Sequence, residues 1–194
     1  MKAITRSGYF TPYLNFTSSH TEPTFSPSTH PNHVLVKVHS AAINPIDYKI
    51  KPIAKLAHPV VGFDLAGVIE EVGSNVTSFQ VGDEVFGQGA EGSLAEKVIA
   101  KESCIAKKPS GLTFSEAAAL PVAYAVGYQG LKDTGDIGPD SETLIIGASG
   151  GCGVSTYSYV FFLKHVGCCI FDFTHVYICI YIAPTMDTRL LLYK

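Results

Sequence analysis

The first hundred residues alternate between short apolar runs and breaks made of polar residues and glycine. Residues 33–38 (HVLVKV) place a valine at every second position, which predicts a half-buried strand. Residues 59–73 (PVVGFDLAGVIEEVG) are rich in Val and Ile, and their glycines mark bulges or sharp bends. A further strand is expected at 93–100, after turns at 82–83 and 86–89. Many short strands separated by turns predict an all-β domain such as a small barrel.

The pattern changes to a helical one after a predicted surface turn at 107–111. Either Thr113 or Ser115 can cap a helix there, and Glu116 in its first turn favours the positive end of the helix dipole. Pro121 can open a second helix, because the first helical position needs no N–H group. The chain therefore predicts a β domain followed by helices.

Residues 143–155 (TLIIGASGGCGVS) read as a strand, a glycine turn and the start of a helix. Glycines at 147, 150 and 153 have the spacing GxxGxxG. Their missing Cβ atoms let the backbone approach a pyrophosphate, which the N–H groups at a helix start can hold. This spacing differs from the commoner GxGxxG, and a glycine turn without a ligand is the alternative.

Composition and charge narrow the class of protein. With 194 residues, 46% of them hydrophobic and 16% charged, the chain can build one or two domains with a sizeable core. A net charge of −3 gives no basic excess for nucleic acid. The five cysteines lack CxxC or zinc-site spacing, and their odd number argues against a disulfide framework. Reduced thiols in a cell interior fit better.

Two segments bear on targeting. The N-terminus (MKAITRSGYF) has no apolar core of signal-peptide length, so we expect a cytoplasmic protein, with an organelle still open. Residues 166–183 are apolar, but Asp172 and His175 interrupt them, and a membrane helix needs about 20 mostly apolar residues. Membrane attachment through this segment is therefore the least supported of the alternative functions.

Four motifs in one order carry a resemblance to a known family. They are residues 44–49 (NPIDYK), residues 62–73 (GFDLAGVIEEVG) completed by FQVGDEV at 79–85, residues 116–121 (EAAALP), and the glycine stretch. In this register they resemble the medium-chain dehydrogenase/reductase superfamily, specifically its zinc-free quinone oxidoreductase branch, which includes enoyl reductase domains. The resemblance covers residue 2 to about residue 167.

The resemblance implies an α/β fold in two parts. A GroES-like β-barrel catalytic domain would occupy residues 1–120, and a partial Rossmann (parallel βαβ) dinucleotide-binding domain residues 121–167. Residues 168–194 match nothing in the family and are expected to be a divergent tail. Full-length relatives often form homodimers through a Rossmann edge strand.

The implied reaction is NADPH-dependent reduction of a quinone or an α,β-unsaturated carbonyl (enone) by hydride transfer. By match to the NPxDxK motif, the candidate catalytic residues are Asn44 and Lys49. The Asn44 amide can donate a hydrogen bond to the developing oxyanion, and Lys49 can contact the cofactor or the same oxyanion. A solvated Lys49 is equally open. Asp47 is expected to cap a helix or pair with Lys49.

The cofactor residues also follow from the resemblance. Backbone N–H groups around the pyrophosphate would come from Gly150, Gly151, Cys152, Gly153 and Val154. Cys152 is read as a small apolar filler rather than a nucleophile, because no basic group beside it in sequence lowers its pKa. Two further residues would lie near the nicotinamide: Pro121, at the link between domains, and Val126, where the family usually has a threonine. Val126 therefore puts one cofactor contact in doubt.

A metal is not expected. Zinc-dependent relatives have Cys where this chain has Asn44 and His where it has Phe63. Neither side chain here supplies the thiolate or imidazole that a catalytic zinc ion needs.

The resemblance stops where the family continues for well over a hundred residues. One βα unit with at most one further strand would leave a sheet face and edge uncovered. We therefore expect a C-terminally truncated product with weak NADPH binding and little turnover. The alternative function is a non-catalytic remnant, in which the GroES-like domain acts as a binding or dimerisation module.

Overall fold

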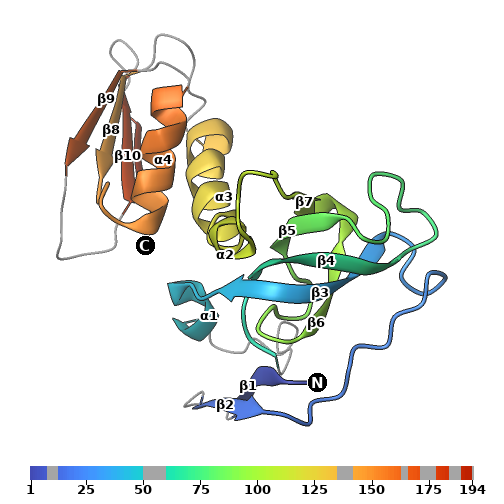
Figure 1. Ribbon diagram of the computed structural model, residues 1–194. Coiled ribbons are helices and arrows are strands. Elements are labelled where there is room, and N and C mark those ends of the chain that lie inside the picture. Colours follow the sequence, from blue (N-terminus) through green and yellow to red (C-terminus); the bar gives the residue numbers. More distant parts are fainter. Residues whose placement is uncertain are drawn as a thin grey trace. The chain divides into compact units, whose positions relative to one another are not determined.

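The computed structural model describes residues 1–7, 13–49, 60–134, 142–162, 166–170, 178–183 and 189–193. The chain forms two compact units, Met1–Pro121 and Val122–Lys194 (Figure 1).

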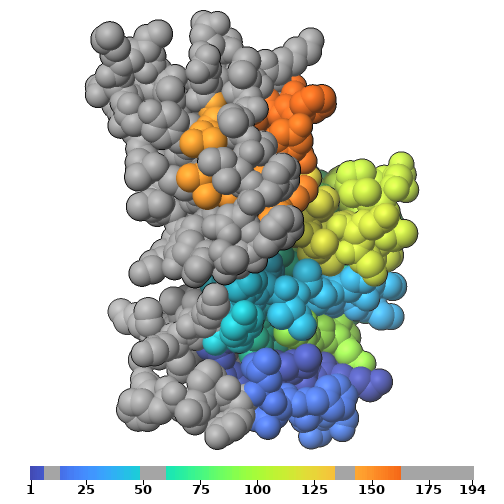
Figure 2. Space-filling view, turned by 90° about the vertical axis from the view of Figure 1, so that its left-hand side faces the viewer, coloured from blue at the N-terminus to red at the C-terminus, as the bar shows by residue number. Residues whose placement is uncertain are grey.

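The first unit is built on a five-stranded antiparallel sheet with the order β6-β3-β4-β5-β7 (Figure 1). Its strands are β3 (His33–Ala42), β4 (Asp64–Val72), β5 (Glu84–Gln88), β6 (Lys97–Lys101) and β7 (Ile105–Lys107). The antiparallel strands β1 (Ala3–Ser7) and β2 (Tyr13–Thr17) are joined to the rest of the unit by bridges from Ala3 to Ala95 and from Thr5 to Val60. The space-filling view shows the blue N-terminal residues packed against the light-blue and cyan part of the unit (Figure 2). The buried core consists of Val34, Val36, Leu65, Ile69, Val85, Val98 and Ala100. The all-β character predicted for this region is confirmed.

Gly67 of β4 lies where strands β3 and β4 approach closely. A Cβ atom at this position would lie 2.1 Å from the carbonyl oxygen of Lys37 on β3. The register of the β3–β4 pair also shifts between Val38 and Ser40, next to the Val38–Gly67 pair. The pairing is therefore irregular beside this glycine, as the prediction of a bulge or bend implies, and the missing Cβ atom of Gly67 lets the two strand backbones approach closely.

The described part of this unit also contains the short helices α1 (Pro45–Lys49), η1 (Glu102–Cys104) and α2 (Phe114–Ala118). Thr113, rather than Ser115, caps α2. Its side chain accepts a hydrogen bond from Glu116 N, while the Glu116 carboxylate accepts one from Thr113 N at 2.8 Å. This reciprocal pair is a capping box.

The surface turn predicted at 107–111 is exposed at the other four positions, but the Lys108 side chain is only 5% exposed. Its ammonium group donates to the carbonyl oxygens of Leu112 (2.6 Å) and Pro109 (3.2 Å), and lies 3.0 Å from the Glu84 carboxylate. The same nitrogen is 5.3 Å from the centre of the Phe114 ring. Lys108 thus ties the turn to β5 and α2.

The second unit contains a four-stranded sheet with the order β11-β10-β8-β9. Its elements are α3 (Pro121–Gln129), which begins at the unit boundary, a π-helical turn η2 (Gly130–Thr134), β8 (Glu142–Ile146), α4 (Gly151–Phe162), β9 (Val166–Ile170), β10 (Ile178–Ala183) and β11 (Arg189–Tyr193). Strands β8 and β9 are parallel and joined through α4, as in a Rossmann βαβ unit. The start of α3 at Pro121 agrees with the prediction.

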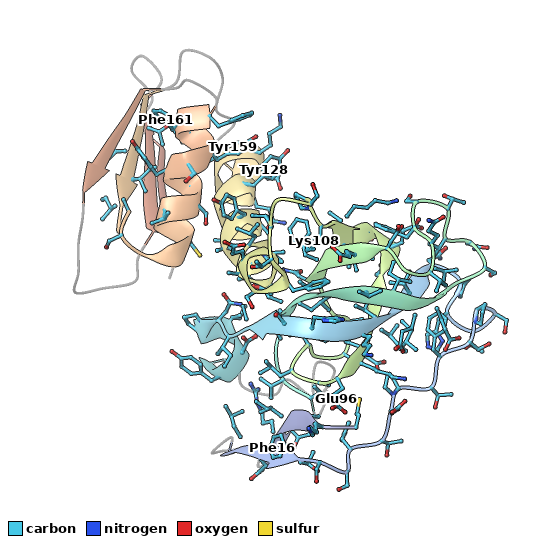
Figure 3. The ribbon with its side chains drawn as sticks, in the orientation of Figure 1. Phe16, Glu96, Lys108, Tyr128, Tyr159 and Phe161 are labelled. Carbon is cyan, nitrogen blue, oxygen red and sulfur yellow. The ribbon has the colours of Figure 1, made fainter. Side chains whose placement is uncertain are left out.

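Helices α3 and α4 pack closely. A Cβ atom at Gly127 would lie 2.6 Å from the Thr156 hydroxyl, so only glycine fits at this crossing. The rings of Tyr128 and Tyr159 meet edge to face with centroids 5.3 Å apart (Figure 3).

The end of the chain departs from the sequence prediction of at most one strand beyond the βα unit. Strands β9, β10 and β11 all join the sheet, and β10 lies antiparallel to both β8 and β11. The physical reason is that residues 178–183 (ICIYIA) and 189–193 (RLLLY) are strand-forming runs, and an open edge of β8 offers backbone partners.

Candidate functional site

Asn44 lies two residues beyond the end of β3, directly before α1. Its Nδ2 donates a hydrogen bond of 2.9 Å to Oδ2 of Asp64, the first residue of β4. Asp64 is fully buried, and its strand pairing with Ala42 brings the two side chains together. One N–H of the Asn44 amide is therefore committed to a buried carboxyl group, which fixes the amide plane.

Asp47 forms two hydrogen bonds with the backbone of Asn44. Its Oδ2 accepts a hydrogen bond of 2.7 Å from Asn44 N, and its own N–H donates to the Asn44 carbonyl oxygen at 3.0 Å. The capping role predicted for Asp47 is confirmed. Burial raises the pKa of Asp47 above its ordinary value, while the hydrogen bond from Asn44 and the positive charge of Arg6 act in the opposite direction.

A hollow of about 90 Å³ opens in the first unit beside this segment; we call it the barrel pocket. Its lining consists of Arg6, Ile46, Asp47, Val60, Val61, Gly62, Phe63, Gly89, Ala90 and Gly92. The walls are mostly apolar, and the polar groups come from one arginine and one aspartate. Arg6 donates a hydrogen bond from Nη2 to the backbone carbonyl of Asp47. Such a pocket suits a small apolar molecule with a few polar atoms.

Lys49, the other candidate catalytic residue, is the last residue of α1. Its side chain lies outside the described residues. Sequence reasoning did not select Arg6 or Asp64. Asp64 carried a usable signal, since it is the one charge within the apolar run at 59–69.

The glycine turn forms the start of α4 in the second unit. Gly147 has φ +77°, a left-handed conformation that favours glycine. A Cβ atom at Gly153 would lie 2.2 Å from the carbonyl oxygen of Gly147, so this glycine lets the helix begin against the turn. Gly150 closes the turn by donating from its N–H to Gly147 O at 3.1 Å. Gly151 is different, because it is exposed and a Cβ atom there would meet nothing within 4 Å.

This helix start has the features of an anion site. The first N–H groups of a helix have no partner within the helix and carry the positive end of its dipole. The first turn of α4 contains no acidic side chain that would compete for them. The open surface at Gly151 leaves space for a bound phosphate.

The other predicted cofactor residues divide into two groups. The side chains of Cys152 and Val126 pack against the core of the second unit, formed by Leu131, Ile145, Ala148 and Val160. This packing agrees with the reading of Cys152 as an apolar filler. Val154 is 49% exposed in the first turn of α4, and Pro121 is the first residue of α3.

At the two positions compared with zinc ligands in the sequence analysis, the structure has Asn44, bonded to Asp64, and Phe63 in the pocket wall. These side chains do not fit a zinc ion. Within the described residues, no three His, Cys, Asp or Glu side chains gather as a metal site would require. Zinc independence itself stays a prediction.

None of the helices in the described part of the chain has both the length and the apolar character needed to cross a bilayer.

Comparison with known proteins gives the family. Residues 30–110 match the alcohol dehydrogenase GroES-like domain. Over 141 residues the chain is 38% identical to 2-methylene-furan-3-one reductase of Solanum lycopersicum, covering 66% of this chain and 36% of the relative. Over 127 residues it is 35% identical to the quinone oxidoreductase of Homo sapiens, covering 63% of this chain and 39% of the relative. The solved quinone oxidoreductase of Pseudomonas syringae pv. tomato DC3000 superposes with a TM-score of 0.70 and 28% identity, over 87% of this chain and 52% of that one.

The chain belongs to the medium-chain dehydrogenase/reductase superfamily, among its quinone oxidoreductase-like members. The predicted family and the predicted fold class, a GroES-like domain followed by an incomplete Rossmann part, are confirmed. The chain spans little more than a third of the length of these two curated relatives.

Proposed function

We propose that the protein is an NADPH-dependent reductase of quinones or enones that works without zinc. The observation that carries this proposal is the start of α4, where Gly147 is left-handed, Gly153 packs against the turn, and a Cβ atom at Gly151 would meet nothing within 4 Å. Oxidoreductase relatives of the same family support it. NADPH rather than NADH, and a cytoplasmic location, are part of the proposal.

In this proposal, different residues bind the cofactor, stabilise the substrate oxygen and exclude water. The backbone from Gly151 to Gly153 would hold the pyrophosphate, because the N–H groups of Gly150 and Val154 already donate to the carbonyl oxygens of Gly147 and Gly150. A nicotinamide bound there would supply the hydride. The Asn44 amide keeps one N–H on Asp64 at 2.9 Å, which leaves its second N–H for the substrate oxygen. Donation to that oxygen stabilises the negative charge that develops on it as hydride arrives. The apolar walls of the barrel pocket exclude water from the acceptor.

A second candidate is a non-catalytic binding or dimerisation module. It is favoured by the antiparallel strand β10 beside β8, because the Rossmann fold places a parallel strand there. In this case the first unit, with its own core, would carry the function.

Calorimetric titration with NADPH tests the proposal. We expect binding by the native chain, weaker than that of a full-length relative, and a further loss in Gly151→Ala, whose new methyl group meets no protein atom but intrudes on the phosphate. Gly111→Ala is the matched control, since a Cβ atom there also meets nothing within 4 Å. NADPH oxidation with 1,4-benzoquinone tests the chemistry. A native chain that binds no NADPH contradicts the proposal and supports the module.

A further inference from the structure

The two carboxyl oxygens of Asp47 have different surroundings. Oδ2 accepts the hydrogen bond from Asn44 N at 2.7 Å. Oδ1 is buried and has no hydrogen-bond partner among the described residues, and the residue as a whole is only 3% exposed. Leaving a buried polar atom without a partner is unfavourable, more so when it is charged. The helix cap therefore explains one oxygen of Asp47 and leaves the other without a structural role.

The charged groups around Asp47 come from two neighbouring elements. Arg6 of β1 bonds to the backbone carbonyl of Asp47 and is the positive charge acting on its carboxyl group. From β4, Asp64 meets the side chain of Asn44. On α1 itself, Tyr48 is 50% exposed. Burial dominates over the charge of Arg6 and raises the pKa of Asp47. This environment favours the neutral acid over the carboxylate.

We propose that Asp47 is the proton donor of the barrel pocket, which it lines, and that Oδ1 carries the proton. This inference rests on the proposed function. Hydride addition to a quinone or to the β-carbon of an enone leaves a hydroquinone anion or an enolate. The proton on Oδ1 of Asp47 passes to that anion, completing the hydroquinone or the saturated ketone. Asp47 is left as a carboxylate and regains a proton from water.

The apolar lining of the barrel pocket indicates which class of substrate Asp47 would protonate. Apart from Arg6 and Asp47, the lining is made of aliphatic residues, Phe63 and glycines. A neutral, flat acceptor whose carbonyl group reaches Asp47 fits these walls.

The test compares Asp47→Asn with the native chain. The amide is isosteric, and its oxygen can still accept from Asn44 N, so the cap is retained while the acidic proton is lost. With NADPH and 1,4-benzoquinone in single-turnover mixing, we expect the variant to be slower by about a hundredfold or more, the usual contribution of a general acid. We also expect the native rate to fall as pH rises through the pKa of Asp47, and this dependence to vanish in the variant. Asp83→Asn, on a turn away from the pocket lining, is the acid control and should keep the native rate.

A second measurement decides the inference independently of turnover. The side-chain carboxyl carbon of Asp47, assigned by its absence in Asp47→Asn, is titrated by NMR in the full chain. A pKa above the ordinary range of aspartate supports the proposal, and a pKa at or below that range overturns it. A native chain that oxidises no NADPH would contradict the proposed function. An unchanged rate and pH profile in Asp47→Asn, with an active native chain, would overturn only the role of Asp47.

Discussion

The Asn44 amide and the Asp64 carboxyl group form a direct hydrogen bond of 2.9 Å, and Asp64 is fully buried. The pair joins the segment after β3 to the beginning of β4. This bond therefore orders the segment directly before α1.

Replacing Asn44 should therefore affect stability as well as activity. Asn44→Ala removes one donor from a buried carboxyl group, and we expect a loss of about 1–3 kcal/mol in the free energy of unfolding. Asn44→Asp should reduce the free energy of unfolding further, because it places a second carboxyl group beside that of Asp64. Urea unfolding followed by circular dichroism measures both. Ile43→Ala, at a position 68% exposed, is the control, and an equal loss there would refute the assignment.

Two adjacent lysines should behave differently. Lys108→Met removes a buried ammonium group from two carbonyl oxygens and the Glu84 carboxylate, and we expect a loss of about 2–3 kcal/mol. Lys107→Met should have a much smaller effect, since that side chain is 60% exposed and its bond to Asp83 is screened by water. Thermal unfolding of both variants provides the comparison. Equal shifts in Tm would show that the burial of Lys108 is unimportant.

The glycines of α4 should tolerate alanine unequally in the fold itself. Gly153→Ala places a methyl group 2.2 Å from Gly147 O, and relief of this overlap requires a backbone shift costing about 1–3 kcal/mol. Gly151→Ala has open space and should keep the native stability. Hydrogen exchange of the α4 amides measures the difference within the second unit. Faster exchange in Gly151→Ala than in Gly153→Ala would contradict the geometry.

The capping box predicts the acid sensitivity of α2. The hydrogen bond from Thr113 N lowers the pKa of Glu116 in the folded state. A lowered pKa gives stability that is complete above the unfolded pKa and is lost as pH falls through the folded pKa. Glu116→Gln should therefore weaken the chain at neutral pH and flatten its acid unfolding curve. Unfolding midpoints across the acid range test this, and an unchanged slope would exclude the linkage.

The contribution of Asp47 to stability should depend on pH in the opposite direction from that of Glu116. Its pKa is raised in the folded state, so its stabilising effect is present below the unfolded pKa and is lost as pH rises through the folded value. Asp47→Asn should remove that decline, and the variant should gain stability relative to the native chain on going from acid to neutral pH. A relative loss in the same series would show that the carboxylate is stabilised instead.

Local features of the fold were predictable from sequence because neighbouring residues determine them. The cap at Thr113, the helix start at Pro121 and the strand–turn–helix around Gly147 depend on side chains a few positions apart. The β domain followed from alternation and glycine placement.

The rest depends on contacts between distant parts of the chain. Asn44 meets Asp64 only because β3 and β4 pair with a particular register. The burial of Lys108 requires Glu84 of β5, and the pocket needs Arg6 from β1. The pairing of β10 with β8 involves residues more than 30 positions apart. No local sequence pattern encodes contacts between residues so far apart in the chain. The sequence could therefore indicate candidate residues but not how they are arranged in space.

The position of β10 also limits which further strand can pair with β8. A strand has two hydrogen-bonding sides, and those of β8 are taken by β9 and β10. A fragment supplying the remaining parallel strands of a full-length relative could not dock beside β8 until β10 was peeled away. Split-protein complementation should accordingly succeed only with a version of this chain that stops after Ile170.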